Sequence, residues 1–157
     1  MSVAALRVFI ELRPAPAASP HTTPTPRHLR EMARRALSVC RVTGRIAFAL
    51  AFTDDAEMRR LNRMYAGNDY ATDVLSFPNE EAGPPFAMRA AGKRYLGDIA
   101  IALPTAERQA QQAGHSLYAE IDLLLTHGLL HLLGYYHAVA VERQVMERLQ
   151  RKALQKS

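Results

Sequence analysis

Three histidines near the C-terminus carry the strongest structural information in this chain: His127-Gly-Leu-Leu-His131-Leu-Leu-Gly134-Tyr-Tyr-His137. Residues four apart project from the same face of a helix, so His127 and His131 can reach one ion. A straight helix would carry His137 away from them, but Gly134 readily takes the left-handed conformation that ends a helix and turns the chain back. The spacing therefore predicts a metal site built from all three histidines at the C-terminal end of a helix.

The ligand set indicates zinc and a catalytic role. Three neutral imidazoles leave a fourth coordination position open to water, as in catalytic zinc sites, whereas structural zinc sites are closed by four ligands. Metzincin proteases share this ligand and glycine spacing. They place a glutamate directly after the first histidine as general base, and here that position is Gly128. We therefore expect one zinc ion per chain and disfavour peptide hydrolysis. The alternative is a pair of half-buried helical histidines with an unrelated third.

Hydrophobic periodicity and turn residues predict nine elements in the order β-α-β-α-β-β-α-α-α. The predicted strands cover residues 8–12, 45–52, 72–77 and 96–103, and the helices cover 27–41, 54–65, 104–112, 116–133 and 138–154. Residues 14–26 and 79–94 are rich in proline or glycine and are predicted to be flexible loops. This order predicts a single α+β domain over residues 1–157, with helices covering a mixed four-stranded sheet and the zinc-binding helix near the C-terminus.

Composition restricts the class of protein. Hydrophobic residues make up 48% of the 157-residue chain, which is enough for a core, and no stretch of 18 apolar residues predicts a membrane span. The N-terminus is interpreted as a strand rather than a signal peptide. Cys40 is the one cysteine, which fits a reducing compartment, so we expect a cytoplasmic protein. The formal net charge of +5 favours a polyanionic partner without establishing one.

Several motifs, in order and spacing, resemble those of the YbeY endoribonucleases, the rRNA-maturation factors of bacteria. They are Leu61-Asn62, TDVLSFP (72–78), LGDI (96–99), GHS (114–116) and HGLLHLLGYYH (127–137). The resemblance covers about residues 51–137. It implies a zinc-dependent, single-strand-specific endoribonuclease that acts in rRNA processing, notably near the 3′ end of the small-subunit rRNA, and in ribosome quality control. The zinc ligands that it implies map onto His127, His131 and His137.

The resemblance also implies a basic groove beside the metal in which single-stranded RNA can lie. The partners expected are therefore single-stranded RNA or rRNA and the ribosome or its small subunit. Four residues are candidate RNA contacts: Arg59 and Arg63 on the predicted second helix, Ser76 in TDVLSF, and His115 before the metal-binding helix. Surface, capping or hydrogen-bonding roles are the alternatives for these side chains. The sequence assigns no separate catalytic base.

Two departures from the family pattern bear on activity. Ala66 stands where the family usually has arginine, whose guanidinium would bind a phosphate bidentately. Tyr136 stands where the signature has aspartate, which could orient a metal ligand. These departures favour a second hypothesis, a ribosome-associated assembly or binding factor with weak or no nuclease activity. A metalloprotease shares the ligand spacing but would lack its glutamate.

Overall fold

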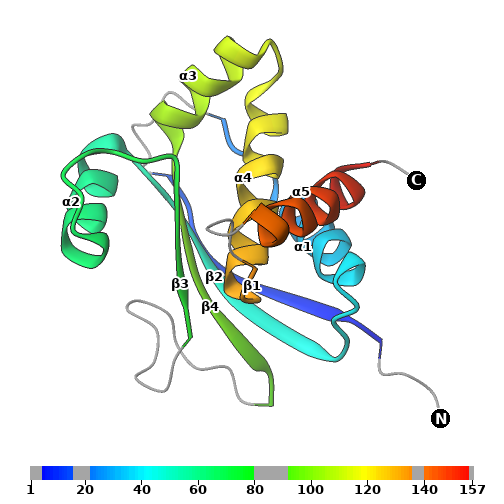
Figure 1. Ribbon diagram of the computed structural model, residues 1–157. Helices are drawn as coiled ribbons and strands as arrows, with labels where there is room; N and C mark the ends of the chain where they lie inside the picture. The colour runs from blue at the N-terminus through cyan, green and yellow to red at the C-terminus, as the bar shows by residue number, and fades with distance from the viewer. Residues whose placement is uncertain (1–4, 16–21, 80–91, 136–139, 156–157) are drawn as a thin grey trace.

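The computed structural model describes residues 5–15, 22–79, 92–135 and 140–155, which form four strands and five helices (Figure 1). Their order is the predicted one. The elements are β1 (Arg7–Arg13), α1 (Pro26–Val39), β2 (Arg45–Thr53), α2 (Asp55–Ala66), β3 (Val74–Pro78), β4 (Arg94–Ala102), α3 (Leu103–Ala113), α4 (Leu117–Leu132) and α5 (Ala140–Leu154).

Two predicted loops are shorter than expected at one end. Pro26 is the first residue of α1, because Thr25 caps the helix by accepting a hydrogen bond from the backbone of His28 and proline suits a first helical position. Arg94 is the first residue of β4. Residues 16–21 and 80–91, which make up much of the two predicted loops, lie outside the described residues, so their flexibility stays a prediction.

The four strands form one mixed sheet, as predicted, in the order β1-β2-β4-β3. β2 is parallel to both of its neighbours, β1 and β4, whereas β3 is antiparallel to β4. Parallel neighbours require crossover connections, and α1 supplies the one between β1 and β2. β1 and β3 are the two edges of the sheet.

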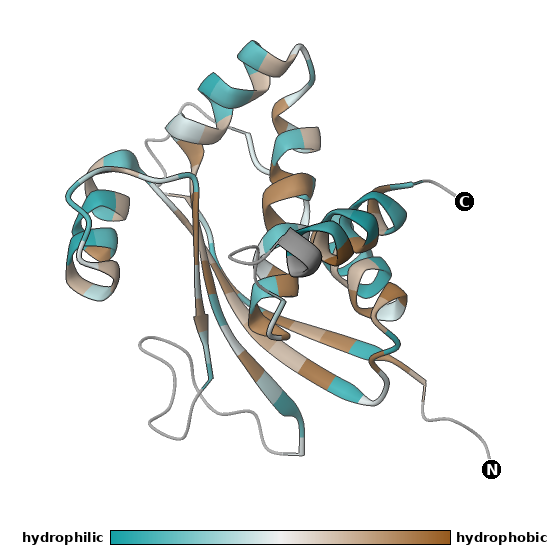
Figure 2. Cartoon of the chain, in the orientation of Figure 1, coloured by the Kyte–Doolittle hydropathy of each residue, from teal (hydrophilic) through white to brown (hydrophobic). Residues whose placement is uncertain are grey.

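The two faces of the sheet are covered differently. α1, α4 and α5 pack on one face, where the large apolar side chains of β2 and β4 form the main core. α2 packs on the other face against Ala100 and Ala102, near the C-terminal end of β4. Figure 1 shows α2 and α4 on opposite sides of β3, and Figure 2 shows apolar residues along the strands and α4. No described helix is long and apolar enough to cross a membrane.

Gly97 is the point where β3, β4 and the end of α4 come together. The pairing of β4 with β2 shifts in register between Ala47 and Ala49, beside Gly97, whose φ is +138°. A Cβ at position 97 would overlap the carbonyl oxygen of Phe77 and lie 3.0 Å from Cδ2 of Leu132. Only glycine therefore allows this backbone conformation and this close approach.

We expect Gly97→Ala to lower the free energy of unfolding by about 3 kcal/mol, because it adds both backbone strain and a backbone clash. Gly44→Ala is the matched control: φ is +89° there, but no atom lies within 4 Å of the added Cβ. It should cost about 1–2 kcal/mol, from strain alone. Urea unfolding of both variants measures the difference, and equal losses would contradict the packing role of Gly97.

Candidate metal centre

Helix α4 ends in a Schellman motif that turns the chain after the second histidine. Gly134 has φ +96°, and its N–H donates to the carbonyl oxygen of His131 at 3.0 Å. The N–H of Tyr135 donates to the carbonyl oxygen of Leu130 at 2.9 Å. These two bonds satisfy carbonyls that the end of the helix would otherwise leave without donors. The helix-ending role predicted for Gly134 is therefore confirmed.

The structure brings two of the three predicted ligands together. The rings of His127 and His131 lie with their centroids 4.5 Å apart and their planes at 37°. Both side chains are half-buried, and Nε2 of His131 is fully buried. His137 lies outside the described residues. Within residues 5–15, 22–79, 92–135 and 140–155, no three His, Cys, Asp or Glu side chains form a metal-binding group, so the predicted triad is not tested.

Gln150 of α5 orients His127. Its Oε1 lies 3.3 Å from Nδ1 of His127. An amide oxygen is an acceptor only, so this bond places the imidazole proton on Nδ1 and leaves the Nε2 lone pair available to an ion. Metal-binding histidines commonly donate their other N–H in this way. An imidazole that donates through Nδ1, 4.5 Å from a second imidazole, fits a zinc ion held by histidines.

Gly128, next to the first histidine, faces the sheet and is buried. A Cβ there would lie 3.0 Å from Cγ2 of Ile99 and 3.2 Å from Oγ of Ser76. The Ser76 hydroxyl donates to the carbonyl oxygen of Gly128 at 3.1 Å, which ties α4 to β3. A glutamate at position 128 would have to enter this contact. The position thus disfavours the general base of the proteases for a packing reason, and glycine itself supplies no acid or base.

The arginines predicted as RNA contacts lie on α2, on the opposite face of the sheet from α4. Arg59 donates through Nε to Oδ1 of Asp69 at 2.8 Å, and Nη1 of Arg63 lies 3.7 Å from the same oxygen. These arginines lower the pKa of Asp69 below its usual value, chiefly through the hydrogen bond from Arg59. Arg59 and Arg63 therefore share one carboxylate, and their contact with RNA stays a prediction.

The other two candidate RNA contacts have structural partners. Ser76 is the hydroxyl that ties β3 to α4. Nε2 of His115 lies 2.6 Å from Oε1 of Glu120, a buried carboxylate in the first turns of α4. His115 precedes the capping residue Ser116. At a rise of about 1.5 Å per residue, it lies more than roughly 15 Å along α4 from His127. The structure does not bring His115 to the histidine pair.

Sequence reasoning missed Gln150 and Glu120. Gln150 is a polar residue in an amphipathic helix, and no spacing rule connects it with a histidine on another helix. Glu120 offered a weak signal, because an acidic residue in the first turn of a helix is favourable there anyway. Its burial beside His115 depends on how α3 and α4 pack.

Comparison with known proteins identifies the family. The family model described as "Endoribonuclease YbeY" matches residues 19–157. The chain belongs to the YbeY endoribonuclease family. Among curated YbeY proteins, that of Moorella thermoacetica is 48% identical over 115 residues, covering 72% of this chain and 74% of its own length. The YbeY of Thermobifida fusca is 41% identical over 126 residues, covering 80% of this chain and 81% of its own length.

A solved structure shows the same fold at lower sequence similarity. The solution structure of a Thermotoga maritima protein aligns with a TM-score of 0.57 and 22% identity, over 93% of this chain and 87% of that one. Together with the sheet and helices above, this alignment confirms the predicted α+β architecture of this YbeY family member.

We expect Gln150→Leu to weaken zinc binding by about 10–100-fold, because partners that orient a metal-binding histidine have effects of that size. Gln150→Glu keeps an acceptor oxygen for Nδ1 of His127 and should restore most of the affinity. Gln111→Leu, an exposed change on α3, is the control. Competition with a chromogenic zinc chelator measures all three. Wild-type affinity in Gln150→Leu would show that Gln150 does not orient the ligand.

Proposed function

We propose that this chain is a zinc-dependent, single-strand-specific endoribonuclease that acts in rRNA processing, including maturation of the small-subunit rRNA 3′ end and ribosome quality control. The observation that carries the proposal is the pairing of the His127 and His131 rings directly before a Schellman turn, with His137 three residues after Gly134 in the sequence. Membership of a family whose relatives are named endoribonucleases supports the reaction class.

In this proposal His127, His131 and His137 hold one zinc ion. When bound, zinc would act as a Lewis acid toward a phosphoryl oxygen of the RNA. The chain's own residues prepare the site. Gln150 fixes the tautomer of His127, and Ser76 holds α4 on the sheet so that the ring positions stay constant. Gly128 provides no acid or base, so peptide hydrolysis by the protease route is not expected.

The partners proposed are single-stranded rRNA and the small ribosomal subunit, and the compartment proposed is the cytoplasm. The excess of 20 Lys and Arg over 15 Asp and Glu supports a polyanionic partner. Neutralisation of phosphates by cations supplies much of the affinity of proteins for nucleic acids.

A second candidate function is a ribosome-associated assembly factor with weak or no nuclease activity. Ala66 favours it, because this exposed residue at the end of α2 has no group that can bind phosphate where the family usually has arginine. Metal-stripped and zinc-loaded protein should be compared in parallel for RNA cleavage and for pre-ribosome binding. Binding that survives metal removal, without cleavage in either form, would favour the assembly factor.

We expect His131→Ala to reduce the zinc content of the purified protein and to lower zinc-dependent cleavage of single-stranded RNA by at least about 100-fold, because one of three ligands is removed. Gln111→Ala, an exposed change on α3, should retain both properties. Metal analysis and a labelled-RNA cleavage assay measure them. Full zinc-dependent cleavage by His131→Ala would refute the proposed metal site.

We expect Ala66→Arg to raise the cleavage rate by about tenfold or more without changing zinc content, because a guanidinium can bind the phosphate or stabilise its developing charge. Met64→Arg is the matched control, since Met64 is exposed on the same helix and the change adds the same charge. Equal rates for the two variants would show that position 66 has no special role.

A further inference from the structure

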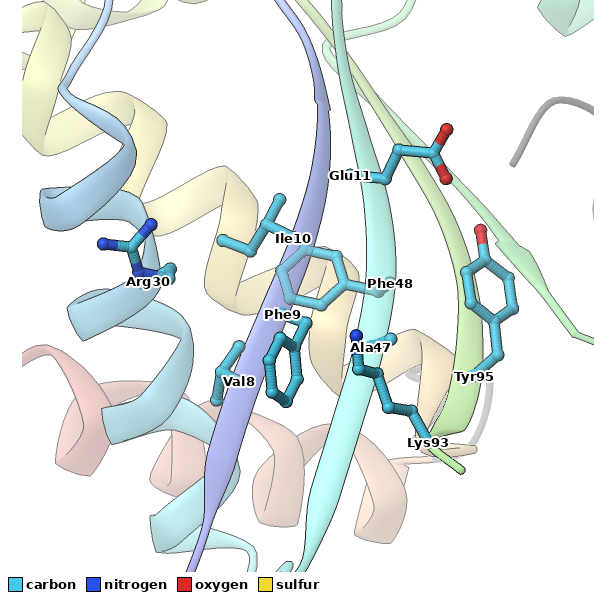
Figure 3. A pocket seen from close by; sticks show the side chains of 9 residues that line it. All are labelled: Val8, Phe9, Ile10, Glu11, Arg30, Ala47, Phe48, Lys93 and Tyr95. Atoms are coloured by element: carbon cyan, nitrogen blue, oxygen red, sulfur yellow. The ribbon is translucent and has the colours of Figure 1, made fainter. Parts of the chain in front are cut away.

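A cavity of about 480 Å³ lies along the N-terminal halves of the first three strands of the sheet. Phe9, Glu11, Ala47, Lys93 and Tyr95 line it from the face on which α2 packs, and Val8, Ile10, Phe48 and Arg30 of α1 complete its lining around β1 (Figure 3). Among the described residues, α2 covers only the C-terminal part of the same face. The volume is in the range of small-ligand and cofactor sites, roughly 300–1,000 Å³.

Register places an aromatic–alanine–aromatic row across this face. Phe9 of β1 is paired with Ala47 of β2, and Ala47 is paired with Tyr95 of β4. Neighbours in register project to the same side of a sheet, and Figure 3 shows the two rings on either side of Ala47. The small alanine side chain makes a low floor between two rings. Aromatic side chains on a sheet face are a common platform for bases of single-stranded RNA.

Three cations lie next to this row, toward the N-terminal ends of the strands. Nζ of Lys93 lies 3.9 Å from the centroid of the Phe9 ring, and Cζ of Arg45 lies 5.5 Å from it. Arg7 is the direct strand neighbour of Arg45. Within the described part of the chain, no carboxylate forms an ion pair with any of the three. Like charges on adjacent strands destabilise a sheet, so their grouping calls for an anionic partner.

The opposite end of the cavity is acidic, which gives the site a direction. Glu11 lines the cavity there. The hydroxyl of Tyr95 donates to Oδ1 of Asp98, whose side chain is fully buried. A phosphate is repelled by this end and attracted by the end that carries Lys93. Hydrogen-bond donors on a base edge suit the acidic end instead.

We propose that this cavity binds one nucleotide of single-stranded RNA, with the phosphate at Arg7, Arg45 and Lys93 and the base over Ala47, between the rings of Phe9 and Tyr95. The inference rests on the proposed function for its choice of RNA. It adds a binding site on the face of the sheet opposite His127 and His131, so RNA can be held there without touching the metal site.

The test compares two triple variants in the full chain that remove the same number of positive charges. R7Q/R45Q/K93Q neutralises the three cations grouped near the Phe9 ring, of which Lys93 lines the cavity itself. R34Q/R60Q/R108Q neutralises arginines that already pair with carboxylates. Binding of a fluorescent uncleavable single-stranded RNA should weaken at least tenfold in the first and less than twofold in the second. The slope of log K against log salt should become shallower by about 0.7 for each phosphate that the variant no longer neutralises. Equal weakening in the two variants would overturn the proposal.

Phe9→Leu tests the base stacking separately from charge. Loss of one stacking ring should weaken RNA binding by roughly 5–150-fold, which corresponds to the loss of about 1–3 kcal/mol of binding free energy seen on alanine substitution. Urea unfolding shows whether the variant is folded. If it misfolds, Lys93→Gln alone, which removes the ammonium over the ring, must still weaken binding. Wild-type affinity in folded Phe9→Leu would exclude stacking. If the wild-type chain bound poly-glutamate as tightly as RNA, and R7Q/R45Q/K93Q lost that binding, the ligand of the cavity would be an acidic peptide rather than RNA.

Cleavage assays separate failure of this inference from failure of the proposed function. For long RNA, R7Q/R45Q/K93Q should show a higher KM with an unchanged kcat, since the metal site is intact. If the wild-type chain cleaves RNA and this variant binds RNA normally, the cavity proposal fails alone. If the wild-type chain cleaves nothing and the variant still binds RNA more weakly, the proposed nuclease function fails and the cavity proposal stands.

Discussion

The candidate metal centre depends on how closely α4 lies against the sheet. Gly128 brings the helix backbone to β3 and β4, where its carbonyl accepts the Ser76 hydroxyl, and Gly97 allows the last turn to approach β4 through Leu132. Close-packed interiors transmit small changes of volume to their neighbours. A side chain at either glycine would displace the turn that carries His131, so the geometry of the imidazole pair is fixed by packing on the other side of the helix.

Because of this packing, the two sides of α4 have different roles. The side toward the sheet is apolar or glycine and sets the position of the helix, while His127 is turned toward α5 and meets Gln150. A residue directly after His127 projects about 100° away from it around the helix, which here means into the sheet. The protease arrangement needs that residue in the active site. The fold of this chain therefore separates it from zinc proteases that share its histidine spacing.

The sequence predicted every element because local signals and periodicity agreed. Asp54 and Ser116 accept hydrogen bonds from the backbones of Glu57 and Ala119, as their positions before apolar helices indicated. The glycine after the second histidine predicted the turn for the same local reason. Gln150 could not be predicted, since its meeting with His127 depends on the angle between α4 and α5. The helix boundary at Pro26 differed by one residue, within the usual scatter of helix ends.

The net charge of the chain likewise could not predict where a polyanion would bind. A formal +5 is a sum over the chain, whereas attraction of a polyanion depends on which cations lack a nearby carboxylate. The predicted contacts Arg59 and Arg63 share Asp69, so much of their field is neutralised locally. Arg45 and Lys93 instead meet on an aromatic ring. Aromatic faces attract cations without cancelling their charge. The ring of Phe9 can thus hold two cations together for a phosphate, a placement that requires the register of β1 against β2.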